Sequence, residues 1–438
     1  MIETVKNAWS IPELRKKLTY TVMIVLIFRI GAAIPVPFID ASVIQAMFAH
    51  AAQGNGANPL AFIDMMTGGA FASATLFAMS IAPYITASIV INLLTVAIPA
   101  LERLAKEGEE GRRRLAVITR YTTLGLAIVQ SIAYYVMNRN MGSISHRYGA
   151  EGVFAAVVIV MSFAAGAMLI VWLGESIDKK GVGNGISIIL FSGIISRAPS
   201  AIMLLWGMIQ MGQLGATRFY FFAPAVVALF IFLVGAIVLM TNAERRIPVQ
   251  YAKRVVGRKM YGGQSSYIPI KVTMSGVMPI IFASSLLAMP GMILGFIDPW
   301  GNMDTWFANF LRLFTFNTML YAALYLVLII AFNYFYVAIQ YNPIEMANNM
   351  RKNSGTIPGI RPGKPTSDFI SRVIGKITLA GALFIAGVGI LPIILTNLTA
   401  VNIALGGTSI IIVVGVALDT VRQLESQMMM RHYKGFLE

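Results

Sequence analysis

The stretch that decides the fold is TGGAFASATLFAMSIAPYI, Thr67 to Ile85, where small and apolar residues follow two glycines and lead to Pro83. A helix that crosses lipid needs about 20 apolar residues, and a break within it leaves backbone groups that lipid cannot satisfy. Such backbone is tolerated only beside protein or a water-filled cavity. The stretch therefore predicts an interrupted helix next to a cavity, with close helix packing through small residues as the alternative.

The composition indicates a membrane protein. Of 438 residues, 57% are hydrophobic and 12% are charged, and the mean hydropathy is +0.73, which is too apolar for an ordinary soluble domain. Continuous apolar runs exclude a β-barrel, whose strands alternate. The predicted fold is an all-α polytopic membrane protein with ten transmembrane helices. Their centres lie near Val25, Val90, Leu126, Val160, Leu190, Phe230, Phe282, Leu328, Leu383 and Ile412.

Basic residues predict the orientation. They are concentrated on both tails and on alternate loops, for example at 15–17, 112–114 and 351–352, so the positive-inside rule places both termini in the cytoplasm. Five spans in residues 1–210 precede five in residues 211–438. An odd number of spans in each half permits an inverted repeat about an axis in the membrane plane.

Two long loops on the basic side have patterns of their own. The loop 241–270 alternates apolar and basic residues before a glycine pair, which predicts a β-hairpin. The loop 341–369 has Pro358 and Pro362 close to Arg361, which predicts a stiff, shaped connection.

The spans offer no site for catalysis or ion coupling. Every Asp and Glu lies in a loop, in a tail or at a helix end, with Asp419 closest to the hydrocarbon, whereas ion-coupled carriers place ionisable groups near the midplane. The three histidines lack metal-ligand spacing, there are no cysteines, and GIRPGKP lacks the Ser or Thr of a phosphate-binding loop. We therefore expect no enzyme activity and no cofactor, with a partner supplying the energy for directed work.

Aliphatic residues recur at helical spacing near the glycines and prolines of several spans. If these helices converge, the side chains form a narrow apolar constriction that resists water and ions by dewetting. Taken singly, each residue is more commonly lipid-facing or packed. We refer to the set as the collar: Ile81, Ile85, Ile186, Leu190, Ile281 and Ile412.

Several motifs make the chain resemble the SecY family, the pore subunits of the bacterial protein-conducting channel. They include the opening stretch, LERLAKEGEEGRRR, WLGESIDKKGVGNGISIILF, KVTMSGVMPIIFASS and NPIEMANNMRKNSGTIPGIRPG. The resemblance implies two five-helix halves around a central hourglass pore that opens sideways into lipid, with the collar at its waist. It also implies a short external helix, the plug, at about 61–72, for which Gly68 and Gly69 form a hinge.

The same resemblance implies a lateral gate between spans two and three on one side and seven and eight on the other. Its polar positions match Asn92, Gln130 and Thr273, and Thr273 stands where the family often has Asn, although ordinary helix contacts would explain the same residues. The loops 241–270 and 341–369 would dock the SecA ATPase or the ribosome. The matching basic residues are Lys253, Arg254, Arg258, Lys259 and Arg361.

The family also implies partners and a location. SecE and SecG would complete a heterotrimer in the bacterial plasma membrane, and signal peptides and nascent chains would be the substrates. The net charge of +15 suits ribosomal RNA phosphates and anionic lipids. Two other functions stay open from the residues alone: a secondary transporter of a small solute, and a scaffold that presents basic loops to ribosomes without transport.

Overall fold

A computed structural model gives the fold, and it describes most of the chain. The described residues are 2–53, 64, 67–145, 149–213, 217–251, 254–256, 259–261, 265–297, 305–314, 318–399 and 407–434.

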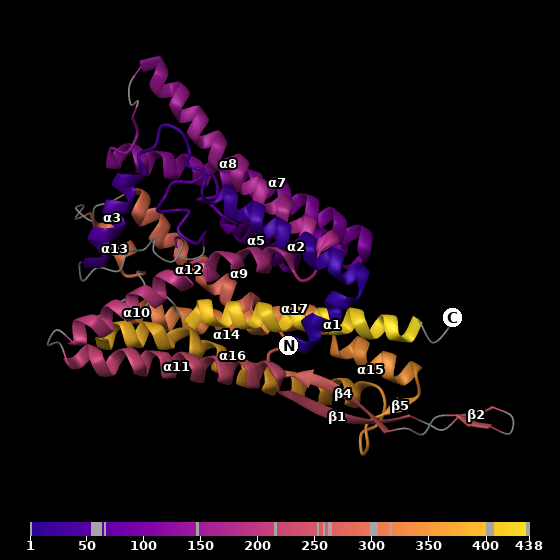
Figure 1. Cartoon of the computed structure of the whole chain (residues 1–438). Helices are drawn as coiled ribbons and strands as arrows, with labels where there is room; N and C mark the ends of the chain where they lie inside the picture. Colours follow the sequence, from indigo (N-terminus) through magenta and orange to yellow (C-terminus); the bar gives the residue numbers. More distant parts are fainter. Residues whose placement is uncertain are drawn as a thin grey trace.

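The long helices form two groups that diverge from each other (Figure 1). One group comprises α2 (Pro12–Gly31), α5 (Ala82–Ala97), α7 (Glu109–Met141) and α8 (Gly149–Lys180). The other comprises α11 (Thr217–Asn242), α14 (Met319–Gln340), α16 (Lys364–Thr399) and α17 (Gly407–Lys434). Between the groups run α9 (Gly185–Ile195) and α12 (Met278–Ile297).

Shorter helices complete the fold. They are α1 (Ile2–Ser10), α3 (Ala41–Gln53), α6 (Pro99–Lys106), α10 (Ala198–Gln213), α13 (Trp306–Arg312) and α15 (Pro343–Lys352). The helix α10 packs on α11, so the end of the first half of the chain lies against the second.

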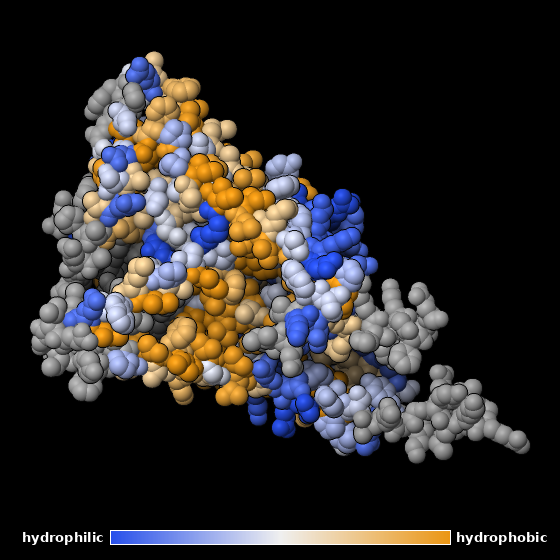
Figure 2. Space-filling view, in the orientation of Figure 1, coloured by the Kyte–Doolittle hydropathy of each residue, from blue (hydrophilic) through white to orange (hydrophobic). Residues whose placement is uncertain are grey.

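The ten predicted apolar centres all fall within helices. Among the described residues, seven helices are long and apolar enough to cross a membrane, or eight if α5 and α6, bent by 101° at their junction, form one broken span. The predicted all-α membrane fold is confirmed, and the ten-helix count is consistent with it. Apolar side chains cover the middle of the visible face, and hydrophilic ones gather toward the end that carries the strands (Figure 2).

The predicted interruption of the opening stretch is also confirmed. Residues 68–81 form successive turns, and α5 starts only at Ala82, with Pro83 in its first turn. Ala74 and Ser80 adopt φ values of 45° and 47°, a left-handed conformation that side chains with a Cβ rarely take. Packing around this segment therefore imposes its path.

The GVGNG turn between α8 and α9 has a structural explanation. Gly183 adopts φ +86°, and the side chain of Asn184 caps α9 by accepting a hydrogen bond from the Ser187 amide at 3.1 Å. A Cβ at Gly185 would collide with the carbonyl oxygen of Gly174 on α8. The glycines therefore let α9 run back against α8, which sets the position of Leu190.

The predicted β-hairpin in 241–270 is confirmed. Strand β1 (Glu244–Tyr251) pairs antiparallel with β4 (Ser265–Lys271), and β2 (Arg254–Val256) pairs with β3 (Lys259–Tyr261) nearer the tip. On its other edge β1 pairs with β5 (Gly355–Thr356) of the second loop. Side chains of both loops share a buried cluster that includes Ile247, Val249, Met350, Ile357 and Ile370. The two loops therefore fold as one body, which we call the sheet end.

Candidate functional site

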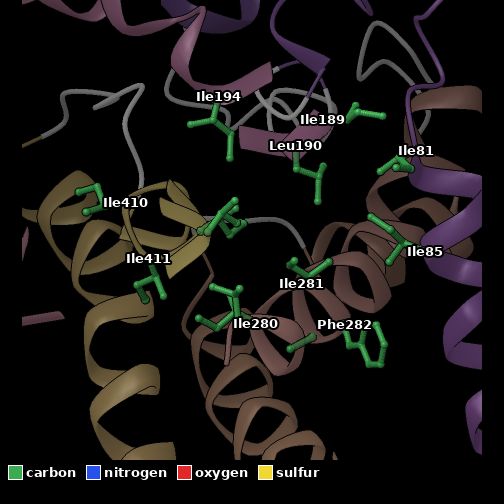
Figure 3. Packing of buried hydrophobic residues seen from close by; sticks show 14 of the residues in the cluster. Ile81, Ile85, Ile189, Leu190, Ile194, Ile280, Ile281, Phe282, Ile410 and Ile411 are labelled. Atoms are coloured by element: carbon green, nitrogen blue, oxygen red, sulfur yellow. The ribbon is translucent and has the colours of Figure 1, made fainter. Parts of the chain in front are cut away.

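The structure gathers the six collar residues into one apolar cluster, and Figure 3 labels four of them, Ile81, Ile85, Leu190 and Ile281. Ile81, Leu190 and Ile412 are 1% exposed, and Ile186 is partly buried against the same cluster. The collar side chains come from α9, α12 and α17 and from the start of α5, so residues far apart in the sequence belong to one cluster. The cluster also holds residues of both helix groups, such as Ile170 of α8 and Tyr325 of α14.

Each collar residue lies at the N-cap or within the first two turns of its helix. Ile81 is the N-cap of α5, and Ile85 follows one turn later on the same face. Ile186 and Leu190 repeat this spacing in α9, and Ile281 and Ile412 lie within two turns of the first residues of α12 and α17. The collar therefore forms where four helices begin, which explains why its residues stand beside glycines and prolines.

Sequence reasoning missed several neighbours that fill the same level. Ile189, Ile194, Ile280 and Ile410 belong to the cluster and lie around the collar in Figure 3. Isoleucine is common in every span. No signal in the sequence separates these four from lipid-facing residues.

The predicted plug lies partly within the described residues, at Asp64 and 67–72, which we call the plug segment; 61–63, 65 and 66 lie outside them. Residues 68–72 form turns and not the predicted helix, since backbone with positive φ at Gly68 and Gly69 cannot continue an α-helix. Gly69 donates its amide proton to the Asp64 carbonyl oxygen at 2.9 Å. Gly68 and Gly69 adopt φ values of +69° and +92°. Glycine is the residue that takes this conformation without strain, so the pair matches the backbone that a compact turn needs here.

The plug segment is fixed to the helices around it. The Tyr134 hydroxyl on α7 donates to the Phe71 carbonyl oxygen at 2.7 Å, and the two rings pack with centroids 4.6 Å apart. Asp64, 5% exposed, forms an ion pair with Arg197, which lies between α9 and α10. These contacts were not predicted, because they join residues that are distant in the sequence.

The helices of the predicted gate are in contact, since α12 packs on both α5 and α7. The three polar gate residues are described, and no hydrogen bond joins them to one another. Asn92 donates to Ser88 on its own helix at 3.4 Å. The Oε1 atom of Gln130 and the Oγ1 atom of Thr273 are buried and lack a partner.

Two cavities separate these gate residues. Gln130 lines a small cavity of about 30 Å³ together with Ser80, Ile81 and Leu190. Thr273 lines a larger cavity of about 520 Å³ that extends from Lys271 in β4 to Ile411, beside the collar. The larger cavity therefore leads from the sheet end toward the collar, and we call it the vestibule.

Charged groups line the vestibule at the sheet end: Lys271, Asp419 and Arg422. Burial and the neighbouring Arg422 lower the pKa of Lys271, and Asp419 and Glu244 partly oppose this. Arg422 also donates to the Thr241 carbonyl oxygen at 2.7 Å, which ties α17 to the end of α11. The vestibule thus has polar groups at its entrance and apolar side chains at the collar.

Of the predicted docking residues, Arg361 is described in full. It is exposed in a turn at the sheet end, and its carbonyl oxygen accepts a hydrogen bond from Thr366 Oγ1 at 2.9 Å. Arg254 and Lys259 lie on β2 and β3, but their side chains fall outside the described residues, as do Lys253 and Arg258 entirely. Within the described chain, no cluster of His, Asp and Glu could hold a metal ion.

The sequence is similar to that of known channel subunits. A family model described as SecY matches residues 75–421. The chain is 42% identical over 445 residues to a protein translocase subunit SecY of Streptomyces coelicolor, with both chains covered completely. It is 39% identical to the Mycobacterium bovis subunit, with 97% of each chain covered.

The fold is similar to solved structures as well. A structure described as a protein-conducting channel has a TM-score of 0.64 at 18% identity, covering 94% of this chain and 92% of the other. Sec61 in a canine ribosome-channel complex has a TM-score of 0.60 at 18% identity, with the same coverage. At this identity the likeness shows the fold.

Proposed function

The chain belongs to the SecY family and is the channel subunit of a protein translocase, and we propose that its collar, plug segment and gate helices carry out the transport. Unfolded secretory polypeptides would enter the vestibule from the sheet end, pass through the collar and displace the plug segment. One observation carries this proposal. Five collar residues belong to a single buried cluster, Ile186 packs against it, and a vestibule of about 520 Å³ lies beside it.

The collar serves as a reversible seal. A constriction lined by aliphatic side chains excludes water and ions by dewetting, and these side chains make no directional bonds that a passing chain would have to break. The backbone of an extended polypeptide cannot cross lipid unpaired. A collar that is dry at rest and can widen around a chain satisfies both requirements.

Hydrophobic segments leave through the gate between α12 and the pair α5 and α7. Van der Waals packing dominates this contact, because Gln130 and Thr273 make no hydrogen bond across it. A segment of about 20 Leu-like residues gains very roughly 6–12 kcal/mol on entering lipid by insertion scales. That gain is large enough to favour an opened gate, whereas a polar segment remains in the pore.

The two halves, 1–210 and 211–438, enclose the pore from opposite sides. We place both termini and the sheet end in the cytoplasm and the protein in the bacterial inner membrane, since the basic residues lie on that side. SecE and SecG would complete the complex, and anionic lipids would surround its basic side.

Docking of partners takes place at the sheet end. The rigid turn that carries Arg361 and the hairpin tip, with Lys253, Arg254, Arg258 and Lys259, would bind the SecA ATPase or ribosomal RNA. The chain itself would supply no catalysis and need no cofactor, so these partners provide the energy.

Reconstitution tests the proposal. Complexes in liposomes, supplied with a SecA-type ATPase, ATP and a secretory precursor, are expected to protect the precursor from external protease. Liposomes without ATP are the control. Solute uptake driven by a proton or sodium gradient, with no precursor protection, would instead favour a secondary transporter.

A further inference from the structure

We propose that the ion pair between the buried Asp64 and the partly buried Arg197 holds the plug segment in its seat, so that both side chains are positioning residues for the closed channel. The inference rests on the proposed function, because it assigns the closed state to a specific contact. It concerns residues outside the collar and the gate. The seat consists of the end of α9, Arg197 just after it, and Arg29 near the end of α2.

Asp64 links the rest of the plug segment to the seat. One carboxylate oxygen accepts the amide proton of Ala72 at 2.8 Å, and the other pairs with Arg197. The Asp64 carbonyl oxygen accepts a further hydrogen bond from Thr67 Oγ1 at 3.0 Å. Movement of Asp64 would therefore carry the segment up to Ala72 with it.

The seat is built around two arginines. Arg29 donates to the carbonyl oxygen of Ser192 at 2.5 Å and to that of Gly193 at 3.4 Å. These bonds supply donors to carbonyl groups in the last turn of α9, which have no partner within the helix. The Nε atom of Arg197 is buried without a partner. Among the described residues, the Asp64 carboxylate is the group that pairs with this guanidinium.

The two glycines allow the segment to approach this seat. A Cβ at Gly68 would lie 2.7 Å from the Gly193 carbonyl oxygen and 3.0 Å from Nη2 of Arg29. A Cβ at Gly69 would lie 3.4 Å from Nη2 of Arg197. This close packing of the two glycines against the arginines does not depend on the ion pair. The packing and the ion pair therefore place the plug segment at the same seat.

The position of the pair connects it to the seal. Arg197 follows the collar residue Leu190 by seven positions, about 10 Å along a helix axis. Removal of Arg197 leaves the charge of Asp64, whose side chain is 7% exposed, without its partner, which is unfavourable. The closed arrangement therefore depends on both partners, and the loss of either favours the displaced segment.

A double-mutant cycle on the complete complex, taken with its partner subunits from its own membrane, tests the proposal. The measurement is resting ion conductance in planar bilayers without substrate. Arg197→Gln is expected to raise this conductance at least about tenfold, the factor that 1.4 kcal/mol produces. Asp64→Asn, which keeps an oxygen for the Ala72 amide, is expected to raise it as well. The double variant removes both charges and should conduct less than Arg197→Gln alone.

Control variants separate charge from shape and from general damage. Asp64→Glu and Arg197→Lys keep their charges and should stay sealed. Arg120→Gln breaks the ion pair with Glu175 between α7 and α8, away from the seat, and should also stay sealed. Three results would overturn the proposal. The single neutral variants could conduct no more than the parent, or the two effects could multiply in the double variant as independent effects do. The third is equal conductance of Asp64→Glu and Asp64→Asn.

Precursor translocation in the same preparations distinguishes this inference from the proposed function. Sealed neutral variants that translocate normally would refute the ion-pair latch alone. Failure of the parent complex to translocate any precursor would refute the channel function itself.

Discussion

The hydroxyl of Tyr134, fully buried on α7, donates a hydrogen bond to the carbonyl oxygen of Phe71 across 2.7 Å. The bond joins a long helix to a segment of successive turns. The turns are hydrogen-bonded within themselves, and contacts of this kind fix their position against the helices. Tyr134 thus provides an attachment for the plug segment that is separate from Arg197.

Replacing this tyrosine tests the attachment. Tyr134→Phe removes one of the two donors to the Phe71 carbonyl oxygen and leaves the Ala74 amide at 3.1 Å, so the expected cost is that of one hydrogen bond, about 0.5–1.5 kcal/mol. The chain has no cysteines, so Ala70→Cys, at a position 2% exposed, provides a unique thiol. We expect Tyr134→Phe to raise its maleimide labelling rate about tenfold, the effect of 1.4 kcal/mol. Tyr325→Phe, whose hydroxyl is buried without a partner, is the matched control and should leave labelling unchanged.

A polar side chain in the collar should break the seal. Ile81→Ser places a hydroxyl among aliphatic side chains and lowers the barrier to wetting, so resting ion conductance should rise severalfold. Ile30→Ser makes the same change on a surface that is 65% exposed, where it should not alter conductance. Equal conductance of the two variants would argue against a seal at this level.

The unpaired hydroxyl of Thr273 predicts a stabilising substitution. Thr273→Val keeps the side-chain shape and removes a buried oxygen that lacks a partner, so the melting temperature of the complex should stay the same or rise. Thr75→Val removes a hydroxyl that donates to the Ala70 carbonyl oxygen at 3.2 Å and should lower it. Thermal unfolding of both variants in one lipid environment checks the difference, and a drop for Thr273→Val would indicate a hidden partner.

Docking should depend on the position of charge as well as on its amount. Arg361→Glu changes an exposed residue held in a turn of the sheet end, and we expect affinity for a SecA-type ATPase or a ribosome to fall about tenfold, or roughly 1.4 kcal/mol. Lys352→Glu makes the same charge change at another exposed residue of this loop and should have a smaller effect. Similar losses would mean that overall charge alone governs binding.

Local patterns in the sequence predicted much of the fold. Alternation in 241–270 indicated the hairpin because a strand places successive side chains on opposite faces. The glycines and prolines near Ile81, Ile186 and Ile281 indicated a collar because broken helices in a membrane must face protein or water.

Other features could not be predicted, because they depend on tertiary contact. Strand β5 has two residues and no pattern of its own, and it exists because Thr356 pairs with Gln250, 106 positions away. The pairing of Asp64 with Arg197 likewise has no local signal. The polar gate residues show the opposite case: the family resemblance suggested a shared polar contact, but Gln130 and Thr273 line different cavities.

The most direct test of the central claim is site-specific photocrosslinking during transport. A crosslinker is placed at Leu190, Ile281 or Ile412 in the collar, or at Leu26, which is 57% exposed on α2, and a secretory precursor is stalled halfway across. If the chain passes through the collar, the stalled chain crosslinks to all three collar positions and not to Leu26. A precursor that is protected from protease while no collar position crosslinks to it would contradict the account.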